Sequence, residues 1–188
     1  CVAYEKMEDY FPPYKLRLTG NPIRFNMLSS AITASAAKRF FGLNPQKPTL
    51  IVIGGSLGAK RINELVAKEL FFFKTHDFQI LWQCGKLYFN KYKTLSSPEV
   101  VIKSFVYEME KLYAAADIII SRAGAGSLSE LSCVGKPLIL IPSPNVTANH
   151  QFHNARELVD KKAAFLVEEC DISKFFKKIF KKLATDHN

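Results

Sequence analysis

Two glycine-rich segments have the composition of phosphate-binding turns. The first, Gly54-Gly55-Ser56-Leu57-Gly58-Ala59, directly follows an apolar run and precedes a segment with helical spacing. Glycines let the backbone approach a ligand closely, and the free N–H groups of a helix start favour anions. Ser56 would add a hydroxyl, with Gly54, Gly55 and Gly58 forming the phosphate loop. The spacing fits neither G-x-G-x-x-G nor the P-loop, so a purely geometric turn remains the alternative.

The second segment, residues 121–131 (SRAGAGSLSEL), repeats this design after another apolar run. Two glycine-rich helix starts on one sheet could face a diphosphate from two sides. Ser127 and Glu130 also have capping-box spacing, in which each side chain bonds the other's backbone N–H. Gly135 and Pro137 fit the end of the same helix. Binding and capping therefore both remain open for this pair.

A third segment, residues 142–151, is a polar loop in which Asn149 could cap the next helix. That helix would carry His150, Gln151 and Asn154 on its first turns, where they could hydrogen-bond sugar hydroxyls or face water. His150 and His153 could share a metal ion, but no carboxylate or third His lies nearby. We therefore expect no metal site.

The elements that must position these segments alternate regularly along the chain. Apolar runs at 49–53, 78–82, 100–102, 117–121, 137–141 and 164–167 are separated by helical patterns at 61–72, 87–94, 109–115, 128–134 and 151–160. This alternation predicts an α/β fold, a doubly wound parallel sheet of Rossmann-like type. Such sheets bind ligands at the carboxyl ends of their strands, where the three segments lie.

The first residues have a different character. Residues 1–20 favour a strand, a turn and a strand, followed by a connector at Gly20-Asn21-Pro22, and residues 29–41 favour a short helix. We expect residues 1–22 to be the end of an N-terminal domain with its connector, and residues 23–188 to form the ligand-binding domain. A first residue of Cys suggests a piece of a longer protein.

The net charge of +9 favours an anionic partner: nucleic acid, an acidic membrane surface or phosphorylated small molecules. No nucleic-acid motif accompanies the charge, so we expect no nucleic-acid partner. The four cysteines lack metal-ligand spacing, and no apolar stretch is long enough to span a membrane. Residues 173–183 (SKFFKKIFKKL) would form an amphipathic helix that either lies on an anionic membrane or packs on the domain itself.

Four motifs together resemble those of a known family. Residues 19–24 (TGNPIR), 54–59 (GGSLGA), 121–131 and 144–155 (PNVTANHQFHNA) occur in the order found in MurG-type enzymes. These are inverting N-acetylglucosaminyltransferases of glycosyltransferase family 28, and the chain is similar to their C-terminal, donor-binding half of a GT-B architecture. The resemblance covers nearly the whole chain.

The resemblance implies roles for individual residues. The substrate-binding residues it implies are Arg24, Ser56, Val106, Arg122, Ala125, Gly126, Ser127, Leu128, Ser129, Glu130, His150, Gln151 and Asn154. Among them, Ser56 would lie near the donor phosphates, Val106 at the uracil and Glu130 at the ribose hydroxyls. Gln151 would contact the sugar, whereas some relatives carry Gln where this chain has His150.

The resemblance also implies a reaction. Family members move GlcNAc from UDP-GlcNAc to lipid I, giving lipid II, without a metal ion or other cofactor. The acceptor and general base belong to the N-terminal domain, so no catalytic residue is expected here, and this piece, soluble by itself, should bind donor without turnover. The whole enzyme would work peripherally at the cytoplasmic face of the inner membrane. Alternatives are a UDP-GlcNAc 2-epimerase, another lipid glycosyltransferase, or a non-enzymatic nucleotide-binding module.

Overall fold

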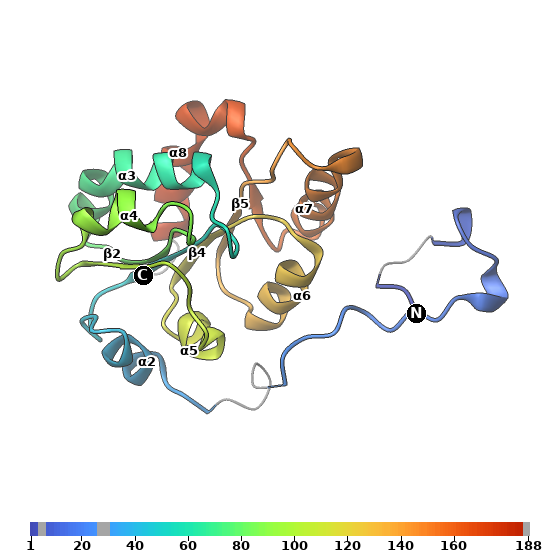
Figure 1. Ribbon diagram of the computed structural model, residues 1–188, viewed down its shortest axis with the longest axis horizontal. Helices are drawn as coiled ribbons and strands as arrows, with labels where there is room; N and C mark the ends of the chain where they lie inside the picture. The colour runs from blue at the N-terminus through green and yellow to red at the C-terminus, as the bar shows by residue number, and fades with distance from the viewer. Residues whose placement is uncertain (4–6, 26–30, 186–188) are drawn as a thin grey trace.

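The computed structural model describes residues 1–3, 7–25 and 31–185. A six-stranded parallel sheet with the order β3-β2-β1-β4-β5-β6 forms its centre (Figure 1). The strands are β1 (Thr49–Ile53), β2 (Gln79–Gln83), β3 (Val100–Lys103), β4 (Ile118–Ser121), β5 (Leu138–Leu140) and β6 (Phe165–Leu166). Each lies where an apolar run predicted a strand, so the sheet expected from the sequence is confirmed.

Helices connect successive strands, with one further helix before β1 and one after β6. They are α2 (Ala34–Phe40), α3 (Lys60–Thr75), α4 (Phe89–Tyr92), α5 (Met109–Ala114), α6 (Ala125–Val134), α7 (His150–Asp160) and α8 (Ile172–Thr185). Short 3-10 turns occur at η1 (Met7–Asp9), η2 (Pro13–Lys15), η3 (Lys93–Leu95), η4 (Thr147–Asn149) and η5 (Glu169–Asp171). The helix predicted at 87–94 is reduced to α4 and η3. None of the helices in the described ranges is long and apolar enough to cross a membrane.

The central residues of the strands are apolar on both sides, because helices cover both faces of the sheet. Leu50 and Val52 point into a core built with α3, α4 and α8, whereas Ile51 and Ile53 point into a second core built with α2, α5, α6 and α7. Side chains alternate between the faces of a strand, so one continuous apolar run supplies both cores. The doubly wound prediction is confirmed.

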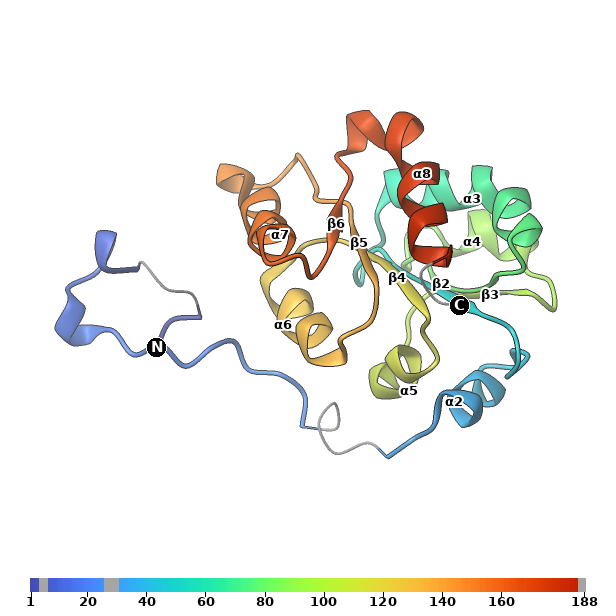
Figure 2. The same ribbon diagram turned by 180° about the vertical axis from the view of Figure 1, so that it is seen from behind.

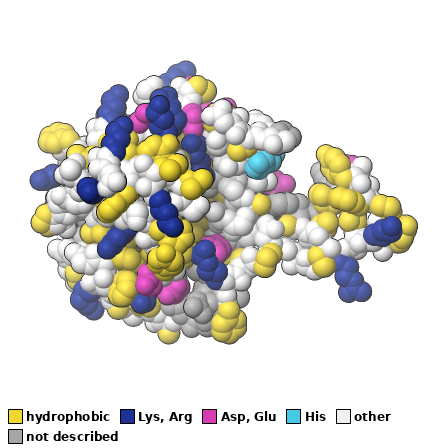
Figure 3. Space-filling model, viewed as in Figure 1, with side chains coloured by type: hydrophobic (Ala, Val, Ile, Leu, Met, Phe, Trp, Pro, Cys, Tyr) yellow, Lys and Arg dark blue, Asp and Glu magenta, His cyan; other side chains and the backbone are white. Residues whose placement is uncertain are grey.

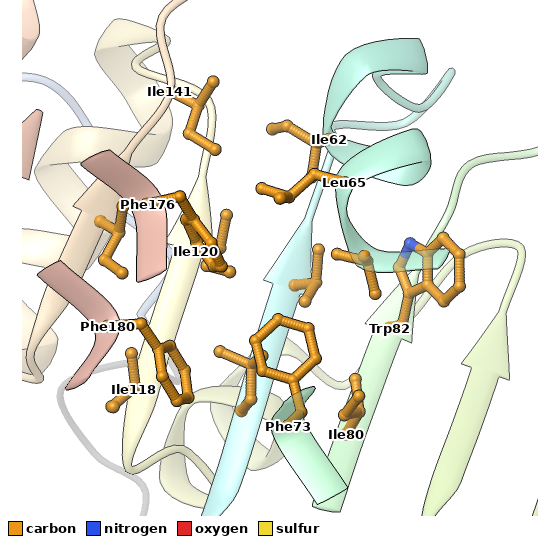
Figure 4. Close-up of a cluster of buried hydrophobic side chains, with 14 of the residues drawn as sticks. Ile62, Leu65, Phe73, Ile80, Trp82, Ile118, Ile120, Ile141, Phe176 and Phe180 are labelled. Atoms are coloured by element: carbon orange, nitrogen blue, oxygen red, sulfur yellow. The ribbon is translucent and has the colours of Figure 1, made fainter. Parts of the chain in front are cut away.

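The last helix belongs to the first of these cores. Phe176 and Phe180 of α8 are buried, and their rings lie 6.0 and 5.1 Å from the Phe73 ring of α3 (Figure 4). Edge-to-face pairs of this kind contribute about 0.5–1.5 kcal/mol beyond burial. The packing interpretation of residues 173–183 is therefore confirmed, and the apolar side of α8 is not free to lie on a membrane.

At the amino ends of the strands, a partly buried ion pair anchors α2. Lys38 Nζ lies 2.7 Å from Asp117 Oδ2, which also accepts a hydrogen bond from the Thr49 N–H. The Thr33 hydroxyl accepts from the Ala36 N–H and caps the helix. Residues 29 and 30 of the predicted helix lie outside the described residues.

The strand-turn-strand prediction for residues 1–20 is wrong. Outside residues 4–6, which are not described, the segment is an extended arm with the turns η1 and η2, and it projects from the sheet domain (Figures 1 and 2). A single bridge joins Val2 to Leu18. The bridge is parallel, whereas two strands joined by a turn would pair antiparallel.

Candidate functional site at the carboxyl edge of the sheet

Strands β1 and β4 are neighbours, and their last residues lie opposite each other. Ile53 pairs with Ser121, so the glycine loops that follow them begin side by side. The strand order reverses here, since the chain proceeds outward from β1 to β3 and then returns to β4 on the other side of β1. In open α/β sheets, ligands bind in the crevice at this reversal.

The first loop needs glycine for space as well as conformation. A Cβ on Gly58 would lie 2.1 Å from the Cys84 carbonyl oxygen, and φ is +88° there. A Cβ on Gly54 would lie 2.6 Å from the Ala59 nitrogen. Gly55, with φ +85°, has open space around it, and Ser56 is exposed. The geometric explanation therefore accounts for all three glycines, through space at Gly54, through φ at Gly55 and through both at Gly58. Because Gly55 also has open space around it and Ser56 is exposed, a ligand could approach both.

The two helices after these loops begin without a side-chain cap. Ala59 occupies the N-cap of α3 and Gly124 that of α6, and neither supplies a capping hydrogen bond. Each helix start therefore presents backbone N–H donors, together with the positive end of a macrodipole of about half a charge. Two such termini beside one switch point favour an anion with two charged groups.

The capping-box interpretation of Ser127 and Glu130 is wrong. Helix α6 begins at Ala125, earlier than predicted, which places Ser127 inside the first turn rather than at the N-cap. Ser127 is exposed, and a Cβ on Gly126 would meet nothing within 4 Å. Within the described part of the chain, the space beside Gly126 is therefore open.

The Glu130 carboxylate is instead held by two donors. Its Oε2 accepts from Arg24 at 3.4 Å and from the Tyr113 hydroxyl at 3.3 Å. Burial, followed by the charge of Glu130, raises the pKa of the Tyr113 phenol, so this donor keeps its proton. Arg24 and Glu130, expected separately at the donor site, thus lie together, and one Glu130 oxygen takes both contacts.

Asn21 ties the connector to the same helix. Its Nδ2 donates to the Ser129 hydroxyl at 3.0 Å and to the Ala125 carbonyl at 3.4 Å. The sequence reasoning did not select Asn21, although it lies within the TGNPIR motif. Both contacts are to the first turns of α6, so the connector positions the site.

Gln83, at the end of β2, was also missed. Its Nε2 donates to the Gly55 carbonyl at 3.2 Å, and its Oε1 accepts from the Val106 N–H at 2.8 Å. The side chain is buried, which gives both hydrogen bonds a structural role. A polar residue closing an otherwise apolar strand was the available signal. The Val106 N–H, expected near the uracil, is occupied by this contact.

Arg122, in the second glycine loop, makes two contacts, both with segments that follow β5 and β6. One guanidinium nitrogen lies 2.5 Å from Glu169 Oε1, and the other donates to the Ile141 carbonyl at 2.9 Å. The Arg122 side chain is only 15% exposed. It therefore joins the ends of β4 and β5 to η5, rather than lying open beside the loops.

Helix α7 brings its amides to this edge. The Ser143 N–H donates to Gln151 Oε1 at 3.0 Å, and Asn154 Nδ2 donates to the Ala123 carbonyl at 3.3 Å. Gln151 thus holds the 142–149 loop, and Asn154 connects α7 to the second glycine loop. Both side chains are partly exposed, which leaves polar atoms for a ligand.

The histidines of α7 are less closely tied to the loops. His150 is exposed and its Nδ1 lies 2.8 Å from the Thr147 carbonyl, while the His153 ring packs against Phe152. Asn149 is the N-cap residue, but its φ of 50° is left-handed and its side chain makes no capping hydrogen bond. The predicted Asn149 side-chain cap is therefore wrong.

Taken with the fold, this edge defines an α/β domain of the Rossmann-like class, with two uncapped helix N-termini at the point where the strand order reverses. The chain belongs to glycosyltransferase family 28, because the family's C-terminal domain model matches residues 49–187.

Curated relatives extend the similarity over the whole chain. A Flavobacterium psychrophilum protein is 50% identical over 187 residues, covering 99% of this chain and 51% of the relative. One from Christiangramia forsetii is 47% identical, with 99% and 51% covered. Both are named UDP-N-acetylglucosamine–N-acetylmuramyl-(pentapeptide) pyrophosphoryl-undecaprenol N-acetylglucosamine transferase. The chain thus spans about half the length of these relatives.

Solved structures agree with this assignment. Acinetobacter baumannii MurG is 26% identical with a TM-score of 0.64, covering 94% of this chain and 50% of that one. A glycotransferase of kitacinnamycin, 18% identical with a TM-score of 0.59, covers 73% and 35% and supports the fold alone. The C-terminal half of a GT-B glycosyltransferase, expected from the sequence, is confirmed.

Proposed function

We propose that the chain binds UDP-GlcNAc and is the donor half of an enzyme that transfers GlcNAc to lipid I, giving lipid II. The names of the two curated relatives, which are 50% and 47% identical to this chain, support this assignment. The domain boundary near residue 22 is part of the proposal, with residues 1–22 leading from an acceptor-binding domain. Because lipid I is a membrane lipid, the enzyme would work peripherally at the cytoplasmic face of the membrane.

One observation carries the proposal: the α3 and α6 N-termini follow neighbouring strands, and neither has a side-chain cap. A diphosphate placed between them would accept from both sets of N–H groups and from the exposed hydroxyls of Ser56 and Ser127. Glu130 and the backbone around Val106 would take the uridine, and Gln151 and Asn154 the sugar. His150 would lie at the outer rim.

The same arrangement favours transfer. As the glycosidic bond breaks, negative charge grows on the departing UDP, and preorganised N–H donors stabilise that charge more in the transition state than in the ground state. The acceptor hydroxyl would attack the anomeric carbon from the opposite face, inverting its configuration. A general base must take that hydroxyl's proton. We assign none within this chain, and expect no turnover by it alone.

Calorimetric titration tests the donor assignment. The 188-residue chain should bind UDP-GlcNAc more tightly than UDP-glucose, and ATP least. Ser127→Ala should weaken UDP-GlcNAc binding several-fold, whereas Ser132→Ala, exposed further along α6, should leave it unchanged. Preferential ATP binding, equal effects of the two substitutions, or lipid II synthesis by the chain alone would each contradict the proposal.

A further inference from the structure

The positive charge of the protein is concentrated on two helices that pack together. Helices α3 and α8 contain nine Lys and Arg against two Glu, a net charge of +7 out of the formal +9 of the chain. All nine cations are exposed: Lys60, Arg61, Lys68, Lys74, Lys174, Lys177, Lys178, Lys181 and Lys182. The remaining residues are close to neutral.

The fold gathers this charge from segments about 100 residues apart in sequence. Contacts between Phe73 of α3 and both Phe176 and Phe180 of α8 hold the helices side by side on one face of the sheet (Figures 1 and 2). Because the phenylalanines point inward, the lysines of α8 must point outward. Figure 3 shows Lys and Arg side chains crowded over the α3 side of the molecule.

Carboxylates neutralise only part of this surface. Glu64 pairs with Lys60 and Arg61, and Glu69 pairs with Lys177 at 2.9 Å. From outside the two helices, Glu99 lies 3.8 Å from Lys74. No ion pair within the described ranges involves the other four lysines of α8, which are Lys174, Lys178, Lys181 and Lys182.

The surface also carries an exposed aromatic side chain. Phe71 of α3 is 78% exposed, and it lies three residues from both Lys68 and Lys74, on the same side of the helix. An aromatic ring flanked by lysines suits the boundary between lipid headgroups and acyl chains. Eight of the nine cations are Lys, whose compact charge suits a diffuse layer of phosphates better than the bidentate contacts of Arg.

We infer that the outer face of α3 and α8 is a docking surface for an anionic phospholipid membrane. It adheres through lysines and the Phe71 ring, whereas the apolar side of α8 stays in the core. The choice of a membrane over other polyanions rests on the proposed function, whose acceptor is a lipid. Attraction of this kind decays over about 8 Å at physiological ionic strength, so binding is salt-sensitive.

Vesicle co-sedimentation of the 188-residue chain, without nucleotide, tests this surface. The chain should bind vesicles of phosphatidylcholine mixed with phosphatidylglycerol, release at high salt, and ignore pure phosphatidylcholine. Each lysine near an anionic surface contributes about fivefold, so the triple variant Lys174→Gln, Lys178→Gln, Lys181→Gln should lose roughly a hundredfold in partitioning. Phe71→Ser should weaken binding several-fold.

A matched control removes the same charge from the opposite side of the sheet. Arg39→Gln, Lys136→Gln and Lys161→Gln together should leave most of the vesicle binding intact. Equal losses in the two triple variants, binding to pure phosphatidylcholine, or tighter binding to duplex DNA than to the vesicles would overturn the inference. The affinity of the α8 triple variant for UDP is measured separately, because it reports on the donor site. Unchanged UDP affinity would distinguish failure of this docking surface from failure of the proposed function.

Discussion

Gln83 accepts a hydrogen bond from the backbone N–H of Val106 at 2.8 Å, and this contact joins two loops at the proposed donor site. The other end of the same amide donates to Gly55. The phosphate loop and the loop expected at the uracil are thus connected through one buried side chain. We infer that Gln83 positions both loops without touching the ligand.

Gln83→Glu should make UDP binding depend on pH. A carboxylate still accepts from Val106 but cannot donate to the Gly55 carbonyl, whereas the protonated acid does both. UDP affinity of the variant should therefore be reduced at neutral pH and recover toward the wild-type value in mildly acidic buffer. Gln83→Leu, which leaves the Val106 N–H unsatisfied, should cost about 1–3 kcal/mol of stability at both pH values. Calorimetry and thermal unfolding provide the two readouts.

Gln79 offers the control, because it is a buried Gln at the opposite end of the same strand. It bonds Asn44 and the Thr49 hydroxyl, away from the glycine loops. Gln79→Glu should lower stability while leaving the UDP affinity of the folded protein unchanged. A loss of UDP affinity equal to that of Gln83→Glu would refute the positioning role.

The Glu130 carboxylate should recognise the ribose. Glu130→Gln should weaken UDP binding about tenfold or more, since hydrogen bonds to charged groups contribute about 1.5–3 kcal/mol. The same substitution should have little further effect on binding of 2′-deoxy-UDP, which has already lost a hydroxyl. If the losses in affinity from Glu130→Gln and from removal of the 2′-hydroxyl were additive, Glu130 would not contact that hydroxyl. Tyr113→Phe, which removes one donor to the carboxylate, should produce a smaller loss.

Gly126→Ala should move stability and binding in opposite directions. The position is helical and has open space, so alanine should stabilise the protein by about 0.5–1 kcal/mol. The added methyl group would project at the start of α6, and UDP affinity should fall. Gly58→Ala should destabilise strongly, because its Cβ would meet the Cys84 carbonyl at 2.1 Å. Chemical denaturation and UDP titration of both variants would check this contrast; unchanged UDP affinity in Gly126→Ala would place the diphosphate away from α6.

The sheet was predictable because the local pattern of apolar residues is sufficient to indicate its two cores. Ile51 and Val52 are adjacent and both fully buried, one on each face, so a continuous apolar run already specifies a two-sided sheet. The prediction of two strands in residues 1–20 was wrong for the opposite reason. Their apolar residues resemble a strand, but a strand needs a neighbour that only long-range folding can supply. The described residues of this segment form only the bridge between Val2 and Leu18.

The loops of the candidate site were also predictable, whereas their contacts were not. Glycine composition located both turns, but spacing could not tell whether Ser127 caps α6 or lies inside its first turn. The partners of Glu130 come from Arg24 and Tyr113, which are distant in sequence and meet only through the connector and α5. The role of Gln83 could not be predicted, because it depends on contacts with two loops that are distant in sequence, at Gly55 and Val106.

The contact between Arg122 and Glu169 leads to a final prediction, which separates direct donor binding from positioning. Both side chains are 15% exposed, and the guanidinium also bonds the Ile141 carbonyl. If Arg122 acts by joining β4, β5 and η5, Arg122→Met and Glu169→Met should each lower stability by about 1–3 kcal/mol, with little added loss in the double variant. Both should then reduce UDP affinity by similar, small factors. The geometry favours this outcome, because the guanidinium is already engaged on the side of β4 that faces β5. A loss in Arg122→Met far beyond that in Glu169→Met, at equal stability, would instead establish a direct contact between Arg122 and the donor.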